Sequence, residues 1–259
     1  MYNILSIGKS GMNATQNKMN SISDDLANAN TMGYKSKIVN FQELLVNEMY
    51  DNEVLKSNNV NVAVINAGTK GSEITNNFNQ GGLITSTGEF HMAIEGSGFF
   101  GVRDAAGNLM LTRNGGFHLN ENNTISDDSG YPLEVDLNVP YQQWGNSKVA
   151  ISTSGEITQE MNGETVLLGR VILYNPDILD SLTPLGEGRY IPSPNVELFN
   201  SIDQPNLFGN IQQNYLESSN VEIVKSMAEM IITQRAYSMN AKTIQSTDEI
   251  MQVINNIKQ

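Results

Sequence analysis

The chain has no cysteine, which excludes disulfide bonds, thiolate metal ligands and thiol nucleophiles. Its two histidines, His91 and His118, are not in a His-Glu-x-x-His arrangement, so the sequence offers no recognisable zinc-binding set. Paired carboxylates occur at Asp24–Asp25 in a helix-like segment and at Asp127–Asp128 in a turn-like segment, where solvated charge is the simpler interpretation. We therefore expect no metal site, no cofactor and no enzymatic activity.

Positive charge is also scarce, because 15 Lys and Arg residues stand against 28 Asp and Glu residues and the net charge is -13. A basic surface of the kind that binds nucleic acid or anionic lipid is missing. No stretch approaches the ~20 consecutive apolar residues of a membrane span. Residues 1–10 lack the basic and apolar regions of a cleavable secretory signal. The composition predicts no nucleic-acid partner, no membrane insertion, and a protein that either stays inside the cell or leaves by another route.

A glycine pattern at residues 96–101, Gly-Ser-Gly-Phe-Phe-Gly, matches the dinucleotide-binding fingerprint by its letters alone. A phosphate-binding loop needs its glycines to open a helix whose N-terminus faces the phosphates. Here the following residues, 102–107, lead into a turn rich in Asp, Ala and Gly. The pattern therefore predicts a β-hairpin and no bound nucleotide.

A helix with a narrow apolar seam is predicted over residues 3–30, where apolar side chains recur at seven-residue steps. Gly8 and Gly11 each cost about 1 kcal/mol relative to alanine in a helix interior, so this helix is expected to be marginal alone. A cluster of asparagines and a glycine predicts the helix end and a tight exit turn. The seam is formed by Leu5, Met12, Met19, Ile22 and Leu26, and the exit turn by Asn28, Asn30 and Gly33.

A second, longer helix is predicted from about residue 221 to the C-terminus, with Ser219 and Glu222 at capping-box spacing. Its main apolar row also follows seven-residue steps, and a second row predicts more than one neighbouring helix. The main row is Ile223, Met230, Tyr237, Ile244 and Met251, and Met227 and Ala241 fill the same face. The second row is Val224, Ala228, Ile231, Met239, Ile250, Ile254 and Ile257.

Between the helices, from about residue 81 to 194, short apolar runs alternate with Gly, Asn and Asp turns, which is typical of antiparallel β structure. The predicted fold is α+β, with a helical domain of coiled-coil type and a central, mostly antiparallel β domain. We expect the helical domain at residues 1–34 and 218–259, a connecting extended region at 35–80 and 195–217, and the β domain at 81–194. A simpler alternative packs both helices on the β domain.

Several blocks of the sequence resemble the bacterial flagellar basal-body rod and hook protein family, in its distal-rod form. The most specific block is Leu26 to Lys35, which is similar to the family pattern Leu-Ala-Asn-x-Asn-Thr-x-Gly-aromatic-Lys. Asp24 and Asp25 depart from the family, whose members usually carry asparagine or another polar residue there. Further blocks lie at residues 93–100, 112–117, 130–133, 216–221, 234–237 and 242–248, in the family's order.

The resemblance implies a motility protein that self-assembles as a homo-polymer. Its terminal helices would stack into a tube that transmits torque to the hook, and its β domain would lie on the outside of that tube. It also implies contacts with other flagellar rod and hook proteins, type III flagellar export without a cleavable signal, and a place in the basal body outside the cytoplasmic membrane. Alternatives are a hook or hook-junction axial protein, or a secreted or phage-tail-like fibre subunit with a binding β domain. We expect the subunit contacts at the seam, the exit turn and the C-terminal row, with Arg235 adding polar contacts.

Overall fold

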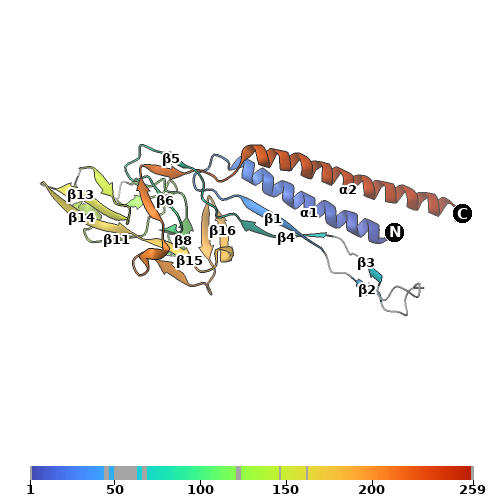
Figure 1. Cartoon of the computed structure of the whole chain (residues 1–259), viewed down its shortest axis with the longest axis horizontal. Helices are drawn as coiled ribbons and strands as arrows, with labels where there is room; N and C mark the ends of the chain where they lie inside the picture. Colours follow the sequence, from blue (N-terminus) through green and yellow to red (C-terminus); the bar gives the residue numbers. More distant parts are fainter. Residues whose placement is uncertain are drawn as a thin grey trace. The chain divides into compact units, whose positions relative to one another are not determined.

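The computed structural model describes residues 2–43, 47–49, 63–65, 69–120, 124–145, 147–161 and 163–257. The fold is α+β, as predicted, with a helix near each end of the chain and antiparallel sheets in the middle (Figure 1). The chain divides into two compact units. Unit 1 comprises residues 1–27, 37–76 and 222–259, and unit 2 comprises residues 28–36 and 77–221.

In unit 1, helices α1 (Tyr2–Ala27) and α2 (Ile223–Ile257) run side by side (Figure 1). Strand β1 (Lys37–Glu43) pairs antiparallel with β4 (Thr69–Asn76), and both strands pack against α1. A short pair, β2 (Asn47–Met49) with β3 (Ala63–Ile65), completes the unit. Strands β1, β2, β3 and β4 lie in the connecting region expected at 35–80, of which residues 44–46, 50–62 and 66–68 lie outside the described residues.

Of the two acids near the end of α1, Asp24 is exposed, as expected for a solvated charge, whereas Asp25 is not solvated. Asp25 is buried, and its carboxylate accepts a hydrogen bond from the Lys37 backbone N–H at 3.0 Å. Asp24 forms an ion pair with the Lys37 ammonium at 2.9 Å. The prediction fails for Asp25 because β1 turns back beside the helix, which a local helical pattern does not reveal. Both acids therefore tie the start of β1 to α1.

Unit 2 contains two larger antiparallel sheets. The six-stranded sheet has the order β16-β17-β8-β7-β15-β18, with bounds Leu182–Gly186, Arg189–Pro192, Leu109–Thr112, Phe99–Arg103, Leu173–Pro176 and Leu198–Asn200. The four-stranded sheet has the order β11-β14-β13-β12, with bounds Val135–Leu137, Glu164–Val171, Glu156–Met161 and Val149–Ile151. Unit 2 also has three two-stranded antiparallel sheets. They are β19 (Asn210–Gln213) with β6 (Met92–Glu95), β20 (Tyr215–Glu217) with β5 (Leu83–Thr85), and β10 (Ile125–Ser126) with β9 (His118–Leu119).

Two of the turns predicted from the sequence are confirmed. The Asp104 carboxylate accepts hydrogen bonds from the backbone N–H groups of Ala106 and Asn108, each at 2.8 Å, and so closes the β7–β8 hairpin. Asp127 holds the next turn in the same way by accepting from the Ser129 N–H. Asp127 is also buried and forms an ion pair with Arg189 at 3.0 Å, so it is not the solvated charge expected from the sequence.

The core of unit 2 lies on both faces of the six-stranded sheet, because successive side chains of a strand point to opposite faces. On β7, Phe100 enters the main hydrophobic core, where its ring meets Phe117 edge to face at 5.3 Å. Its neighbour Phe99 enters a smaller core together with Leu111 and Tyr190. The apolar run at Phe99–Phe100 is therefore a strand that is covered on both sides.

Candidate subunit-packing surface

The two glycines of α1 face α2. A Cβ atom at Gly8 would come within 2.9 Å of Ile244 Cγ1, and one at Gly11 within 3.0 Å of the Asn240 side chain. Further along, Lys18 of α1 approaches Glu229 of α2 at 3.5 Å, so the helices are antiparallel. The glycines weaken α1 by itself, but they allow the two helix backbones to approach closely.

The face of α2 that is covered within unit 1 carries two rows at seven-residue steps. One row is the apolar row predicted from the sequence, in which Met230, Tyr237, Ile244 and Met251 are half-buried. The other row is polar: Thr233 and Thr247 are buried, with half-buried Asn240 between them. Each threonine hydroxyl donates to the backbone carbonyl four residues earlier, so burial leaves neither without a partner. Sequence reasoning missed this polar row because only apolar periodicity was followed.

The other predicted contact residues are covered to different extents. Ile22 is buried, and Leu5, Met12, Met19 and Leu26 are half-buried. In the exit turn Gly33 is buried, Asn28 is half-buried and Asn30 is exposed. Ile223, Met227 and Arg235 of α2 are exposed. The prediction that these residues contact other subunits remains a prediction.

Helix α2 also carries a large exposed apolar surface. The second row is uncovered along the length of the helix, from Val224 at 83% exposed to Ile257 at 79%. Ile231, Met239, Ile250 and Ile254 of the same row are between 44% and 63% exposed. Soluble monomers rarely expose contiguous apolar surface on this scale, and such surfaces mark interaction sites. None of the described helices is long and apolar enough to cross a membrane.

Unit 2 contains a buried ion cluster formed by Lys35, Arg113 and Glu217. The Lys35 ammonium donates to Glu217 Oε1 at 2.6 Å, and Arg113 Nη1 donates to Glu217 Oε2 at 3.3 Å. The Gly81 backbone N–H also donates to Oε1, at 2.9 Å. All three side chains are 6% exposed or less. Burial lowers the pKa of Lys35 and of Arg113, and the negative charge of Glu217 acts in the opposite direction on both pKa values.

Backbone hydrogen bonds around the ion cluster join distant parts of the sequence. The Gly33 N–H donates to the Glu217 carbonyl at 2.8 Å, and Gly33 has a left-handed φ of 69°. The Ser36 N–H donates to Asn220 Oδ1 at 2.8 Å, while the Asn220 amide donates to the Asn77 carbonyl at 2.7 Å. The segments around residues 33–36, 77–81 and 217–220 are therefore fastened together inside unit 2.

The ion cluster explains why three separate sequence blocks carry their particular residues. Lys35 ends the first block, Arg113 lies in the block at 112–117, and Glu217 lies in the block at 216–221. The sequence alone does not connect these blocks, because a pairing across the whole chain leaves no local periodicity. The one feature of the sequence that points to the ion cluster is that each block has a charged residue among turn and strand residues.

No group of three or more His, Asp or Glu side chains suited to a metal ion occurs in the described part of the chain. The glycine pattern at 96–101 enters β7, and the chain then turns into the β8 hairpin at residues 104–107. The helix start required for a phosphate-binding loop is replaced by a strand.

Comparison with known proteins gives a consistent result along the chain. Residues 5–35 match the family described as "Flagella basal body rod protein", residues 93–159 match "Flagellar hook protein FlgE/F/G D1 domain", and residues 212–257 match "Flagellar basal body rod FlgEFG protein C-terminal". The flagellar basal-body rod protein FlgG of Buchnera aphidicola (strain APS) is 32% identical, over 97% of this chain and 98% of the relative. The protein of the same description from Agrobacterium fabrum is 30% identical over 98% and 99%, and that from Bacillus subtilis 28% over 100% of both.

Proposed function

Since the chain belongs to the flagellar basal-body rod protein family and is a structural subunit of the rod, we propose that α1 and α2 pack against copies of the same chain to build a tube. The tube transmits torque to the hook, so its subunits need mutually locked helices and no chemical site. We further propose that the protein is not an enzyme and is exported unprocessed through the flagellar type III apparatus to the basal body.

The exposed apolar row of α2 is the observation that carries this proposal. Burying a Leu, Ile or Met side chain contributes about 1.5–3 kcal/mol, and this row exposes six large apolar residues along one helix. A neighbouring subunit that covers the row with its own helices supplies a stabilisation that the single chain lacks. Coiled-coil packing between helices of different subunits fits the seven-residue spacing of the covered rows.

The residues proposed for these contacts act in two ways. The half-buried row of Met230, Tyr237, Ile244 and Met251 holds α1 against α2 within the chain and presents its outer edges to neighbours. Exposed Met227 and Arg235 reach outward, and the Arg235 guanidinium suits backbone carbonyls or carboxylates of an adjoining subunit. Other flagellar rod and hook components are the proposed partners at the two ends of the tube.

The test compares two triple variants of the full-length chain. Ile231→Gln, Met239→Gln and Ile250→Gln make the exposed row of α2 polar. Ile178→Gln, Leu185→Gln and Leu207→Gln change three comparably exposed apolar residues of unit 2 and serve as the matched control. Light scattering and electron microscopy over a concentration series follow assembly, and urea denaturation follows folding.

We expect the α2 variant to remain dispersed at concentrations where wild type and control assemble. Its free energy of unfolding should stay within about 1.5 kcal/mol of wild type, because each of the three exposed substitutions changes stability by about 0.5 kcal/mol or less. If the α2 variant assembles as readily as the control, the exposed row is not the assembly surface and the proposal is wrong.

A further inference from the structure

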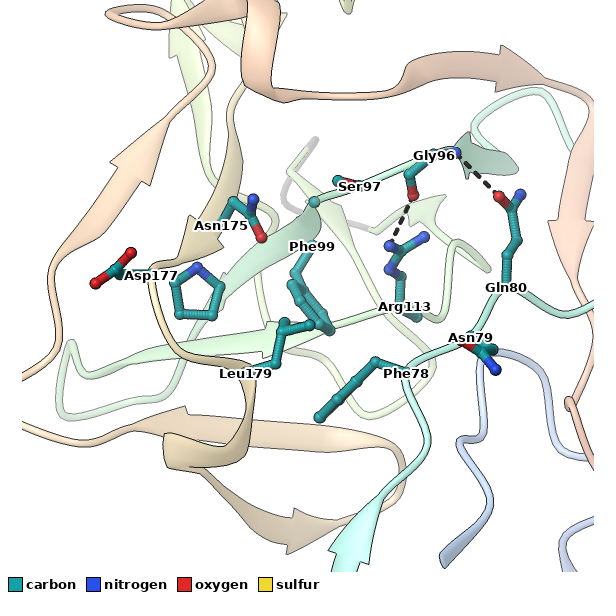
Figure 2. Close-up of a pocket in the computed structure, with 12 residues that line it drawn as sticks. Phe78, Asn79, Gln80, Gly96, Ser97, Phe99, Arg113, Asn175, Asp177 and Leu179 are labelled. Atoms are coloured by element: carbon teal, nitrogen blue, oxygen red, sulfur yellow. Dashed lines mark hydrogen bonds between the residues drawn. The ribbon is translucent and has the colours of Figure 1, made fainter.

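A pocket of about 380 Å³ opens in unit 2 beside the glycine pattern (Figure 2). One side of the pocket is apolar and is formed by Phe78, Phe99 and Leu179. The polar residues of the lining include Gln80, Arg113 and Asn175. Figure 2 shows Leu179 and Phe78 flanking the Phe99 ring, with Arg113 and Gln80 on the opposite side. The shape and lining suit a side chain that has both an apolar stem and a polar head.

Arg113 gives the polar part of the lining its charge. Its guanidinium has five N–H donors, and the structure pairs Nη1 with Glu217 and Nη2 with the Gly96 carbonyl, the latter at 2.8 Å. Within the described residues, Arg113 Nε is buried without a hydrogen-bond partner. The guanidinium carbon lies over the Phe99 ring, 5.1 Å from the ring centroid. Donor capacity therefore remains on a side chain that is only 5% exposed.

The charge around Arg113 is not balanced within the ion cluster. Glu217 is a single anion that serves two buried cations, and Lys35 holds it at 2.6 Å while Arg113 lies at 3.3 Å. One positive charge is left over in surroundings where burial already disfavours it. Asp177 also lines the pocket, but it is exposed, and Figure 2 shows its carboxylate pointing away from Arg113. An incoming carboxylate would supply the missing counter-charge.

We propose that this pocket receives an aspartate or glutamate side chain from a neighbouring copy of the chain. The carboxylate pairs with Arg113, and the stem lies against Phe78 and Leu179. The chain carries 28 acidic residues against 15 basic ones, so a second copy approaches with an excess of carboxylates. Charge-assisted pairing of this kind fixes the register between two surfaces. The inference rests on the proposed assembly, and it adds a contact of the β unit to that of the helices.

The test places a competing carboxylate on the pocket wall without altering Arg113. Ser97 is exposed, lines the pocket and is adjacent to Gly96, which accepts the Arg113 hydrogen bond. Ser97→Glu adds a carboxylate beside the guanidinium, and Ser97→Gln adds nearly the same volume without charge. Both full-length variants are compared with wild type for the critical concentration of assembly.

We expect Ser97→Glu to raise the critical concentration about tenfold relative to Ser97→Gln, because the variant's own carboxylate occupies Arg113. Equal critical concentrations for the two variants would overturn the docking proposal while leaving helix-driven assembly intact. Failure of wild type itself to assemble would overturn the proposed function and this inference together.

A cross-linking experiment identifies the occupant. The chain has no cysteine, so Ser97→Cys provides a unique attachment point for a maleimide-linked photo-reactive group. Assemblies are made from an equal mixture of isotopically labelled and unlabelled copies. We expect cross-links from position 97 to peptides that contain Asp or Glu from the copy of opposite label. Cross-links confined to the same copy, or to peptides without an acidic residue, would overturn the proposal.

Discussion

Gly8 of α1 lies directly against Ile244 of α2, so closely that an added Cβ atom would stand 2.9 Å from Ile244 Cγ1. One turn further on, Gly11 lies against the end of the Asn240 side chain at 3.0 Å. The two glycines share a helix and a facing partner, but they differ in how easily their neighbours can move. The contact at Gly8 is with Cγ1 of the branched Ile244 side chain, which moves aside less easily than the terminal amide of Asn240 that faces Gly11.

Replacing each glycine by alanine should therefore have opposite effects. Gly11→Ala should gain most of the ~1 kcal/mol of helix propensity, since the Asn240 amide can rotate away. Gly8→Ala should lose about 1–2 kcal/mol net, because overpacking against Ile244 exceeds the same gain. Urea denaturation followed by helical circular dichroism measures both. Equal stabilities for the two variants would show that Ile244 adapts as easily as Asn240.

The left-handed glycine of the exit turn gives a second matched pair. Gly33 and Gly107 both have positive φ, at 69° and 87°. A Cβ atom at Gly33 would collide with the backbone of Arg113 and Asn114, whereas one at Gly107 would meet nothing within 4 Å. We expect Gly107→Ala to cost about 1 kcal/mol from backbone strain alone. Gly33→Ala should cost at least about 3 kcal/mol in thermal denaturation, and a cost similar to that of Gly107→Ala would contradict the packing seen here.

Glu217→Gln should be among the most damaging conservative changes in unit 2. It removes the only anion of the ion cluster and leaves Lys35 and Arg113 buried without a counter-charge, at a cost of about 3–5 kcal/mol. The control is Glu134→Gln, which neutralises the partner of Arg103 in an ion pair whose arginine is 45% exposed. That change should cost less than about 1 kcal/mol. Comparable urea midpoints for the two variants would show that the cluster does not stabilise the fold.

Tyr190 makes stability depend on alkaline pH. Burial raises the pKa of this tyrosine from 10.0 to about 12. Between these values the unfolded chain releases the phenolic proton while the folded chain keeps it, so stability falls as pH rises from about 10 to 12. The expected loss from this residue is roughly 2–3 kcal/mol. Tyr190→Phe should flatten the decline in urea midpoints across this range, and an unchanged slope would show that the hydroxyl titrates normally in the folded state.

The parts of the fold that depend on local sequence patterns were predicted correctly. Seven-residue spacing located both helices, and α1 and α2 end or begin within a few residues of the expected positions. Turn residues located the β7–β8 hairpin at Asp104 and a second turn at Asp127. These features depend on residues that are only a few positions apart, so they can be recognised in a single sequence.

Long-range pairing was not predictable in the same way. Lys35 and Glu217 are 182 residues apart, and neither belongs to a periodic row that would have linked them. The interpretation of Asp25 failed for a related reason, since its partner is the backbone of Lys37 after a reversal of the chain. From the sequence, Gly8 and Gly11 were interpreted only as destabilising α1, because helix propensity describes an isolated helix and does not include packing against a neighbouring helix.

The hydrogen bond from the Asn77 N–H to the Ser36 carbonyl, at 2.7 Å, has a consequence for how this chain can change. Residues 37–76 leave and return at adjoining points, and their first and last members pair as Lys37 with Asn76. The two ends of this segment therefore lie side by side and are held together by hydrogen bonds. A change in chain length between β1 and β4 therefore leaves the two ends of the segment, and the flanking residues that hold the ion cluster, at the same separation.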